Sequence, residues 1–109
     1  MKGKIVLLPF PFTDLTKAKL RPALVFLESK DDVVVCFISS KIDKTLSDTD
    51  ILLSTKHKEF ELSGLKVDSV IKLDKIATIL KELIIGEIGC IGEELRKEIN
   101  SIILKIYQV

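Results

Sequence analysis

The amino-acid sequence predicts one small domain of mainly β (α+β) structure: a strongly bent β-barrel over about residues 3–91, followed by a C-terminal α-helix over about residues 92–107. Three observations predict this class. Short apolar runs recur at close spacing, with polar turns between them. Gly86 and Gly89 interrupt the last of these runs, which is typical of a bent or bulged strand. From residue 93 on, the apolar spacing becomes that of a helix. With 109 residues, the chain has the length of a single domain, 1–109, with a real core.

The strands are predicted from apolar runs at residues 5–10, 22–28, 33–39, 51–55, 67–73, 76–80 and 83–91. A short polar turn separates the second run from the third, so these two runs predict an antiparallel hairpin. The third run, VVVCFIS, is apolar almost throughout. Such a run is expected of a strand that is covered on both faces or lies in a small barrel.

The terminal helix is predicted from one apolar stripe at helical spacing, which consists of Leu95, Ile99, Ile102, Ile103 and Ile106. Glu93 and Glu94 lie in its first turn, where the helix dipole favours negative charge. We interpret the stripe as core that packs on the sheet. A dimer seam is the alternative.

The composition excludes several classes of protein. The hydrophobic fraction is 47% and the charged fraction 30%, which indicates a soluble globular chain. The N-terminus has no signal-peptide pattern, and no apolar run approaches the roughly 20 residues of a membrane span, so we expect a cytoplasmic protein without a membrane partner. The net charge is only +1, but residues 1–30 carry a net +4 and residues 31–109 a net −3. The basic excess therefore lies in the N-terminal part, where solvated surface lysines are the alternative to a polyanion site.

The stretch from residue 7 to residue 25 is longer and more basic than a connection between two strands needs to be. Pro9 and Pro11 are expected to end strand pairing, because proline has no backbone donor. Pro22 biases Arg21 towards an extended backbone, which directs the guanidinium outward at the start of the next strand. We therefore predict a functional loop that ends at Arg21.

Few kinds of catalytic site are compatible with the remaining residues. His57 is the single histidine and is expected to face solvent, so one chain cannot supply a pair of acid–base histidines. Cys36 and Cys90 lie in apolar runs without metal-ligand spacing and are expected to be small buried hydrophobes. There is no phosphate-binding glycine loop, nucleophile elbow or carboxylate cluster for a metal. Catalysis would use arginine, hydroxyls, lysine and isolated carboxylates, without metal or cofactor.

Cleavage of RNA by its own 2′-hydroxyl suits that residue set, because the reaction needs no enzymic nucleophile. An arginine fork can hold the phosphate, and a hydroxyl at a strand end can donate to the same oxygens. Arg21 supplies the fork, and Ser39 and Ser40 supply hydroxyls after the third apolar run. The alternative for the serines is that they satisfy backbone groups where the strand becomes a loop.

The segments GKIVLLPFPFTD, LRPALVF, FISSKI and GLKVDSVIKLDKIATI, taken in this order, resemble the MazF/PemK (Kid-like) family of type II toxin endoribonucleases. The similarity covers residues 3–28, 33–42, 64–80 and the helix. It implies an SH3-like small β-barrel that acts as a homodimer, binds a cognate antitoxin peptide or protein, and binds DNA together with that antitoxin. It also implies metal-independent, sequence-selective cleavage of single-stranded RNA, which leaves a 2′,3′-cyclic phosphate and a 5′-hydroxyl.

The resemblance assigns roles to individual residues. Arg21 and Ser39 match catalytic positions of the family, and Asp74 matches an acidic position implicated in some members. RNA contacts are expected from Thr13, Lys17, Lys19, Ser40, Lys41 and Lys72. Phe10 and Phe12 could stack on bases, although a place in the core is favoured for both.

The chain also departs from the family pattern. Ser39 replaces the commoner threonine, and Lys72 stands where some members carry arginine. Lys75 and Ala77 stand where many members have glutamine and arginine. The loss of the family arginine at Ala77 keeps open a non-catalytic RNA-binding relative, or a gyrase-poison-like toxin on the same fold, although the retained Arg21 and Ser39 argue against both. An ordinary structural domain with a coincidental motif is the remaining alternative.

Overall fold

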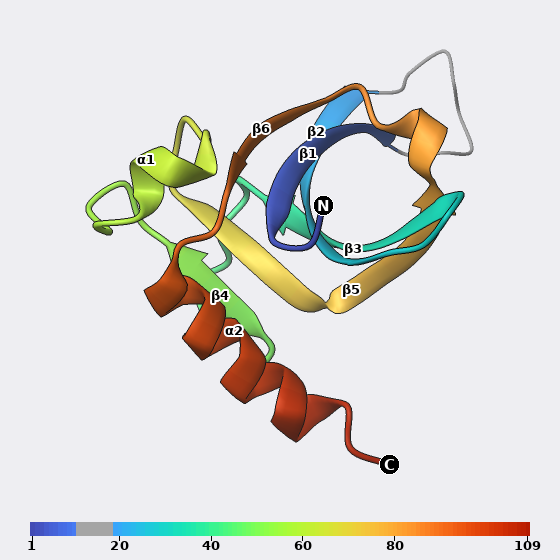
Figure 1. Cartoon of the computed structure of the whole chain (residues 1–109). Coiled ribbons are helices and arrows are strands. Elements are labelled where there is room, and N and C mark those ends of the chain that lie inside the picture. Colours follow the sequence, from blue (N-terminus) through green and yellow to red (C-terminus); the bar gives the residue numbers. More distant parts are fainter. Residues whose placement is uncertain (11–18) are drawn as a thin grey trace.

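The computed structural model describes residues 1–10 and 19–109 and has one curled, six-stranded antiparallel sheet followed by a C-terminal helix (Figure 1). The strand order across the sheet is β4-β5-β3-β2-β1-β6. The strands are β1 (Lys4–Phe10), β2 (Lys19–Glu28), β3 (Asp32–Ser39), β4 (Asp50–Leu53), β5 (Ser69–Leu80) and β6 (Gly86–Cys90). The helices are α1 (Phe60–Ser63), the 3-10 turn η1 (Lys81–Leu83) and α2 (Glu93–Ile106). The predicted mainly β class with a terminal helix is confirmed.

Both faces of the sheet are buried, each in its own cluster of apolar side chains. On one face the sheet packs against the two α-helices, and this cluster includes Ile5, Leu24, Cys36, Leu73, Leu95 and Ile99. The opposite face forms a second cluster because the sheet curls, and it consists of Val6, Leu8, Ala23, Val25, Val33, Val35 and Ile79. Strand β3 contributes to both clusters, which confirms that its apolar run is covered on both faces. Burial raises the pKa of the Cys36 thiol to about 12, so Cys36 acts as the predicted small hydrophobe.

The β1–β2 pair extends further than the prolines suggested. Pro9 lies inside β1 and pairs with Leu20, and β2 begins at Lys19 rather than at Pro22. On its other side, β1 pairs with β6 only as far as Leu7, so the missing N–H of Pro9 points to a side without a partner strand. Pro22 likewise precedes Ala23, the first β2 residue that pairs with β3. The expectation that Pro9 ends pairing is therefore wrong, and Pro11 lies outside the described residues.

The two strands predicted at residues 67–73 and 76–80 are a single strand, β5. The β3–β5 register shifts abruptly: Cys36 pairs with Ile76, but the next β3 residue, Phe37, pairs with Lys72. Leu73, Asp74 and Lys75 therefore have no β3 partner and form a bulge, which we call the β5 bulge. A polar Asp-Lys pair inside an apolar run looked like a turn in the sequence, but it is accommodated within one strand.

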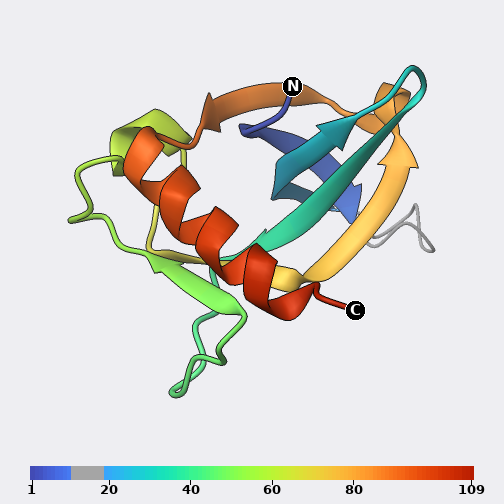
Figure 2. The same cartoon turned by 60° about the horizontal axis from the view of Figure 1, so that its bottom comes forward.

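Helix α2 matches its prediction, and a segment without predicted structure anchors its start. The Glu59 carboxylate accepts the N–H groups of Glu94 (3.0 Å) and Leu95 (2.8 Å), which are among the unpaired donors of the first helical turn. A side chain at Gly92 would come within 2.3 Å of this carboxylate, so only glycine leaves room for the cap. Helix α2 lies across the curled sheet (Figure 2). Its apolar stripe packs on the sheet as predicted, with Leu95 and Ile99 fully buried.

Several smaller expectations need correction. The short helix α1 was not predicted, and it ends at Gly64, which has a positive φ of 72°. His57 is half-buried rather than solvent-facing, because its Nδ1 accepts the N–H of Glu59 at 2.9 Å. Cys90 is only half-buried. In the part of the chain that the structure describes, no helix is both long and apolar enough to span a membrane.

Candidate active site

A cleft of about 580 Å³ opens where β1 and β3 end, β2 begins and β5 bulges. It is lined by Phe10, Arg21, Phe37, Ile38, Ser39, Ser40, Lys41, Lys72, Asp74, Lys75 and Ile76. Most of the ionisable side chains in this set are cationic. The cleft therefore has the size and charge for a phosphate-bearing ligand.

The strand register explains why Arg21 and Ser39 line the same cleft. The last β2–β3 pair is Ala23 with Phe37, and continuing this antiparallel register by two residues brings Arg21 opposite Ser39. Directly paired residues point to the same face of a sheet, and so do residues two apart along a strand. This face is the one that buries Val25 and Val35 in the second cluster. Arg21 and Ser39 therefore continue the row of side chains that begins with Val25 and Val35 in the second cluster. This row becomes polar where it reaches solvent.

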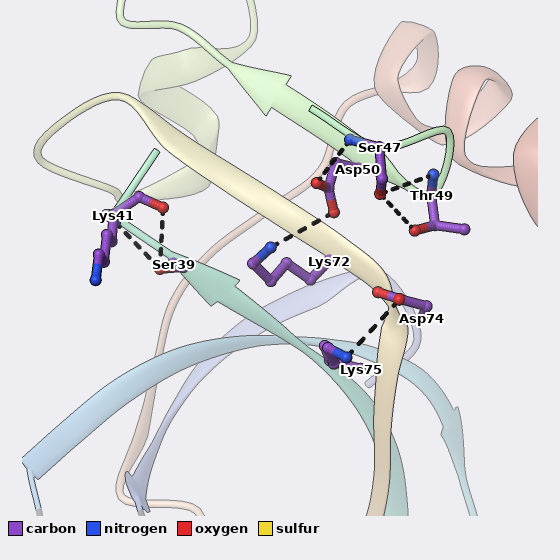
Figure 3. Close-up of polar contacts among 8 residues, drawn as sticks. All are labelled: Ser39, Lys41, Ser47, Thr49, Asp50, Lys72, Asp74 and Lys75. Carbon is purple, nitrogen blue, oxygen red and sulfur yellow. Dashed lines mark hydrogen bonds and ion pairs between the residues drawn. The ribbon is translucent and has the colours of Figure 1, made fainter. Parts of the chain in front are cut away.

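Ser39 also stabilises the turn that follows β3. Its Oγ accepts the N–H of Lys41 at 3.1 Å and lies 3.4 Å from the Lys41 carbonyl oxygen (Figure 3). The backbone role considered as the alternative is therefore present. The 3.4 Å contact is long for a hydroxyl donor, so the Ser39 proton can turn to a better acceptor in the cleft.

The opposite wall of the cleft comes from β5. Lys72 pairs with Phe37 and lies next to the β5 bulge, which carries Asp74 and Lys75. Asp74 is exposed, and its carboxylate lies 3.9 Å from the Lys75 ammonium (Figure 3). We call Arg21 and Ser39 the β2–β3 wall, and Lys72 and Asp74 the β5 wall.

A carboxylate outside the cleft lining holds Lys72. The Asp50 side chain is only 8% exposed, accepts the N–H of Ser47 at 3.2 Å, and lies 3.7 Å from the Lys72 ammonium (Figure 3). A nearly buried carboxylate needs such partners. Asp50 therefore connects Ser47, in the loop before β4, to Lys72 on the β5 wall of the cleft. Sequence reasoning missed it because Asp50 is one of several acidic residues in a polar loop.

An aromatic pair contributes to the lining of the cleft. The rings of Phe10 and Phe37 lie 5.1 Å apart at 51°. Phe10 is 39% exposed, so the expectation that it belongs to the core is wrong, whereas Phe37 packs on the second cluster. An exposed ring beside cations offers a surface on which a nucleobase can stack. Phe12 lies outside the described residues.

The structure brings together most of the predicted site. Arg21, Ser39, Ser40, Lys41, Lys72 and Asp74 all line the cleft. Lys19 is exposed and pairs with Phe10 at the cleft's edge. Thr13 and Lys17 lie outside the described residues. Ala77, which replaces a family arginine, packs on the second cluster.

The structure describes the acidic, histidine and cysteine side chains of residues 1–10 and 19–109. Within these ranges, no three His, Cys, Asp or Glu residues gather in an arrangement that could hold a metal ion.

Fold and site together define a class: small curled β-barrel proteins with a C-terminal helix and a cationic cleft at the strand ends. The family model of the "PemK-like, MazF-like toxin of type II toxin-antitoxin system" matches residues 1–107, so the chain belongs to this toxin family. Toxins of this family are generally endoribonucleases.

Solved structures with the same fold include toxins from mycobacteria. The Mycobacterium tuberculosis toxin MazF-mt6 superimposes with a TM-score of 0.71 at 18% identity, over 94% of this chain and 93% of that one. An "Endoribonuclease in complex with its cognate antitoxin from Mycobacterial species" gives a TM-score of 0.72 at 14% identity, over 100% and 98% of the two chains. At such identities the likeness demonstrates the fold alone. A comparison with curated proteins gives no match.

Proposed function

We propose that this toxin-family protein is an endoribonuclease that cleaves single-stranded RNA in the cleft between the β2–β3 wall and the β5 wall. The observation that carries the proposal is that Arg21 and Ser39 line one mostly cationic cleft, where the β2–β3 register, continued by two residues, places them opposite each other. Family membership over residues 1–107 supports the same reaction class.

In the proposed reaction the 2′-oxygen of a ribose attacks the adjacent phosphorus while the bond to the 5′-oxygen breaks. The 2′-oxygen loses a proton and the 5′-oxygen gains one, so the products are a 2′,3′-cyclic phosphate and a 5′-hydroxyl. The Arg21 guanidinium binds two phosphate oxygens and stabilises the charge that develops on them. Ser39 turns its hydroxyl proton to a phosphate oxygen. Asp74 accepts a hydrogen bond from the attacking 2′-hydroxyl.

The remaining cations hold the RNA strand. Lys41 and Lys72 attract the phosphates on either side of the scissile bond, and Lys19 and Ser40 extend this surface at its edge. A base stacks on the exposed face of Phe10. The walls of the cleft contact the edges of the bases, and these contacts make the cleavage sequence-selective.

The proposed biological setting follows the family. The protein acts as a cytoplasmic homodimer, a cognate antitoxin inhibits it, and toxin and antitoxin together bind DNA. One of the solved relatives is described as an endoribonuclease bound to its cognate antitoxin, which supports an antitoxin partner. An acidic and apolar segment would suit the cationic cleft and its phenylalanines.

The test is cleavage of an unstructured RNA by the purified protein in EDTA, with identification of the new ends. We expect cyclic-phosphate ends from the wild type, and a loss of about 100- to 1,000-fold in kcat for Arg21→Ala, since a preorganised donor to the developing charge is removed. Lys30→Ala is the matched control, because it also removes one exposed cation but lies in the β2–β3 turn. Cleavage at an equal rate by Arg21→Ala, or no cleavage by the wild type, would contradict the proposal.

A second candidate is RNA binding without cleavage. It is favoured by the engagement of the Ser39 hydroxyl with Lys41, and by Ala77 in place of a family arginine. The same assay separates the two, since a binder shifts RNA in a gel while the RNA length stays constant. A toxin that acts on gyrase would neither bind nor cut the RNA.

A further inference from the structure

The β5 bulge poses a structural problem for the β5 wall of the cleft. Leu73, Asp74 and Lys75 have no partners on β3, so the sheet ladder does not fix the backbone that carries Asp74. Backbone groups inside a protein nevertheless need hydrogen-bond partners. A wall of an active site also needs a defined position, because misplacement by about 1 Å can cost 100-fold in rate.

Two hydrogen bonds from outside the strand satisfy the backbone of Leu73, the first residue of the bulge. Its N–H donates to the Thr49 carbonyl oxygen at 3.0 Å. Its carbonyl oxygen accepts the hydroxyl of Tyr107. The Leu73 side chain is fully buried among the residues that pack on α2. The bulge is therefore held on one side by the loop before β4 and on the other by the end of the chain's last helix.

Tyr107 directly follows α2, and α2 is itself firmly anchored. Glu59 caps the first turn of α2, and the α2 side chains Leu95 and Ile99 are buried. Tyr107 lines a groove of about 410 Å³ between α2 and the sheet, and Ile76 lines both this groove and the cleft. The bulge thus separates two hollows, with the Tyr107 ring on one side and the Asp74 carboxylate on the other.

Burial and the negative charge of Asp74 both raise the pKa of the Tyr107 phenol, with burial the larger cause and the Cys36 thiol a smaller one. Lys2 and Arg96 are the cations that line the same groove. Asp74 follows Leu73 directly, so the hydrogen bond from Tyr107 to the Leu73 carbonyl keeps the phenol near this carboxylate.

We propose that Tyr107 is a positioning residue: by donating its hydroxyl to the Leu73 carbonyl, it fixes the β5 bulge and thereby sets Asp74 and Lys72 against Arg21 and Ser39. The kinetic part of this inference rests on the proposed nuclease function, whereas the structural part does not. The simpler role of Tyr107, to fasten the end of α2, predicts a loss of stability but no change at the cleft.

The variant Tyr107→Phe keeps the ring in the groove and removes only the hydrogen-bond donor. We expect faster amide hydrogen exchange at residues 72–75 and a fall of about tenfold in kcat, with KM within about twofold of the wild type. Ser29→Ala is the matched control, since it also removes a hydroxyl that donates to a backbone carbonyl, that of Asp32 in the β2–β3 turn. It should leave both quantities unchanged.

A spectroscopic measurement tests the coupling without RNA. Tyr107 is the only tyrosine and the chain has no tryptophan, so phenolate absorbance reports on this residue alone. Removing the Asp74 charge by Asp74→Asn should lower the pKa of Tyr107, whereas Glu98→Gln, an exposed acid on α2, should leave it unchanged.

The outcomes separate the inference from the proposed function. Unchanged exchange at residues 72–75 in Tyr107→Phe would overturn the inference, whether or not the wild type cleaves RNA. Faster exchange with unaltered kinetics would overturn the positioning role. If the wild type cleaves no RNA, the proposed function fails, while the exchange and absorbance experiments still decide whether Tyr107 fixes the bulge.

Discussion

The two walls of the cleft obtain their geometry in different ways. On the β2–β3 wall, Arg21 and Ser39 follow directly from the antiparallel register that also builds the second apolar cluster. On the β5 wall, Lys72 and Asp74 lie beside or within a bulge, and contacts from other parts of the chain hold them. The first wall is a continuation of the core, and the second depends on distant residues. Substitutions on the first should therefore act on the chemistry directly, and those around the second should act on positioning.

After Arg21→Ala, the largest effect is expected from Ser39→Ala on the same β2–β3 wall. Loss of a hydroxyl that stabilises the transition state should lower kcat about 10- to 100-fold, and Ser39→Thr should restore most of the activity because it keeps the donor. Steady-state RNA cleavage measures both variants. Ser54→Ala is the control, because the Ser54 Oγ accepts the N–H of Lys56 in the same turn geometry outside the cleft. Equal losses in Ser39→Ala and Ser54→Ala would mean that only the turn matters.

A smaller effect is expected from Asp50→Asn on the β5 wall. The amide can still accept the Ser47 N–H but no longer attracts the Lys72 ammonium. We expect KM for RNA to rise several-fold while kcat changes little, because Lys72 binds the strand rather than the reacting atoms. Asp50→Glu should recover part of this loss. Glu87→Gln on β6, which removes a 3.9 Å ion pair with Lys4 on β1, should not change KM. A fall in kcat with constant KM would place Asp50 in the chemistry instead.

The smallest effect is expected far from both walls, at Glu28. Lys81 at 2.7 Å, and then the N-terminal ammonium at 2.6 Å, lower the pKa of Glu28 from 4.5 to about 2. A carboxyl whose pKa is lower in the folded state stabilises the fold above about pH 4.5, and this contribution is lost as the pH falls towards 2. Glu28→Gln should therefore be slightly less stable than the wild type at pH 7, and the difference should shrink by pH 2. Urea unfolding between pH 2 and pH 7 measures this difference in stability, and a difference that does not depend on pH would contradict the assignment. RNA cleavage by Glu28→Gln should equal that of the wild type.

How much of the site could be predicted from sequence differs between the walls. Arg21 before Pro22 and Ser39 at the end of an apolar run were identifiable because their environments are local. Asp74 and Lys72 were predicted only from the family resemblance, because the polar pair Asp74-Lys75 inside an apolar run is typical of a turn between two strands. Asp50 and Tyr107 gave no signal, because an acidic residue in a polar loop and a tyrosine after a helix are both ordinary. Phe10 was misjudged because hydrophobicity alone does not distinguish a core ring from one at the mouth of a cleft.

By itself, the sequence determined the mainly β class, the β2–β3 hairpin, the terminal helix and the two residues of the β2–β3 wall. These depend on apolar periodicity and turn chemistry, which act over a few residues. Only the tertiary structure decided that β5 is one bulged strand, that Glu59 caps α2, and that Asp50 and Tyr107 hold the cleft's second wall. The Glu59 cap and the Tyr107 contact join residues 35 and 34 positions apart in sequence, Asp50 and Lys72 are also far apart, and the bulge requires an irregular register. Such contacts form only when the sheet curls and the helix docks on it. They join residues whose local sequence patterns give no information about each other.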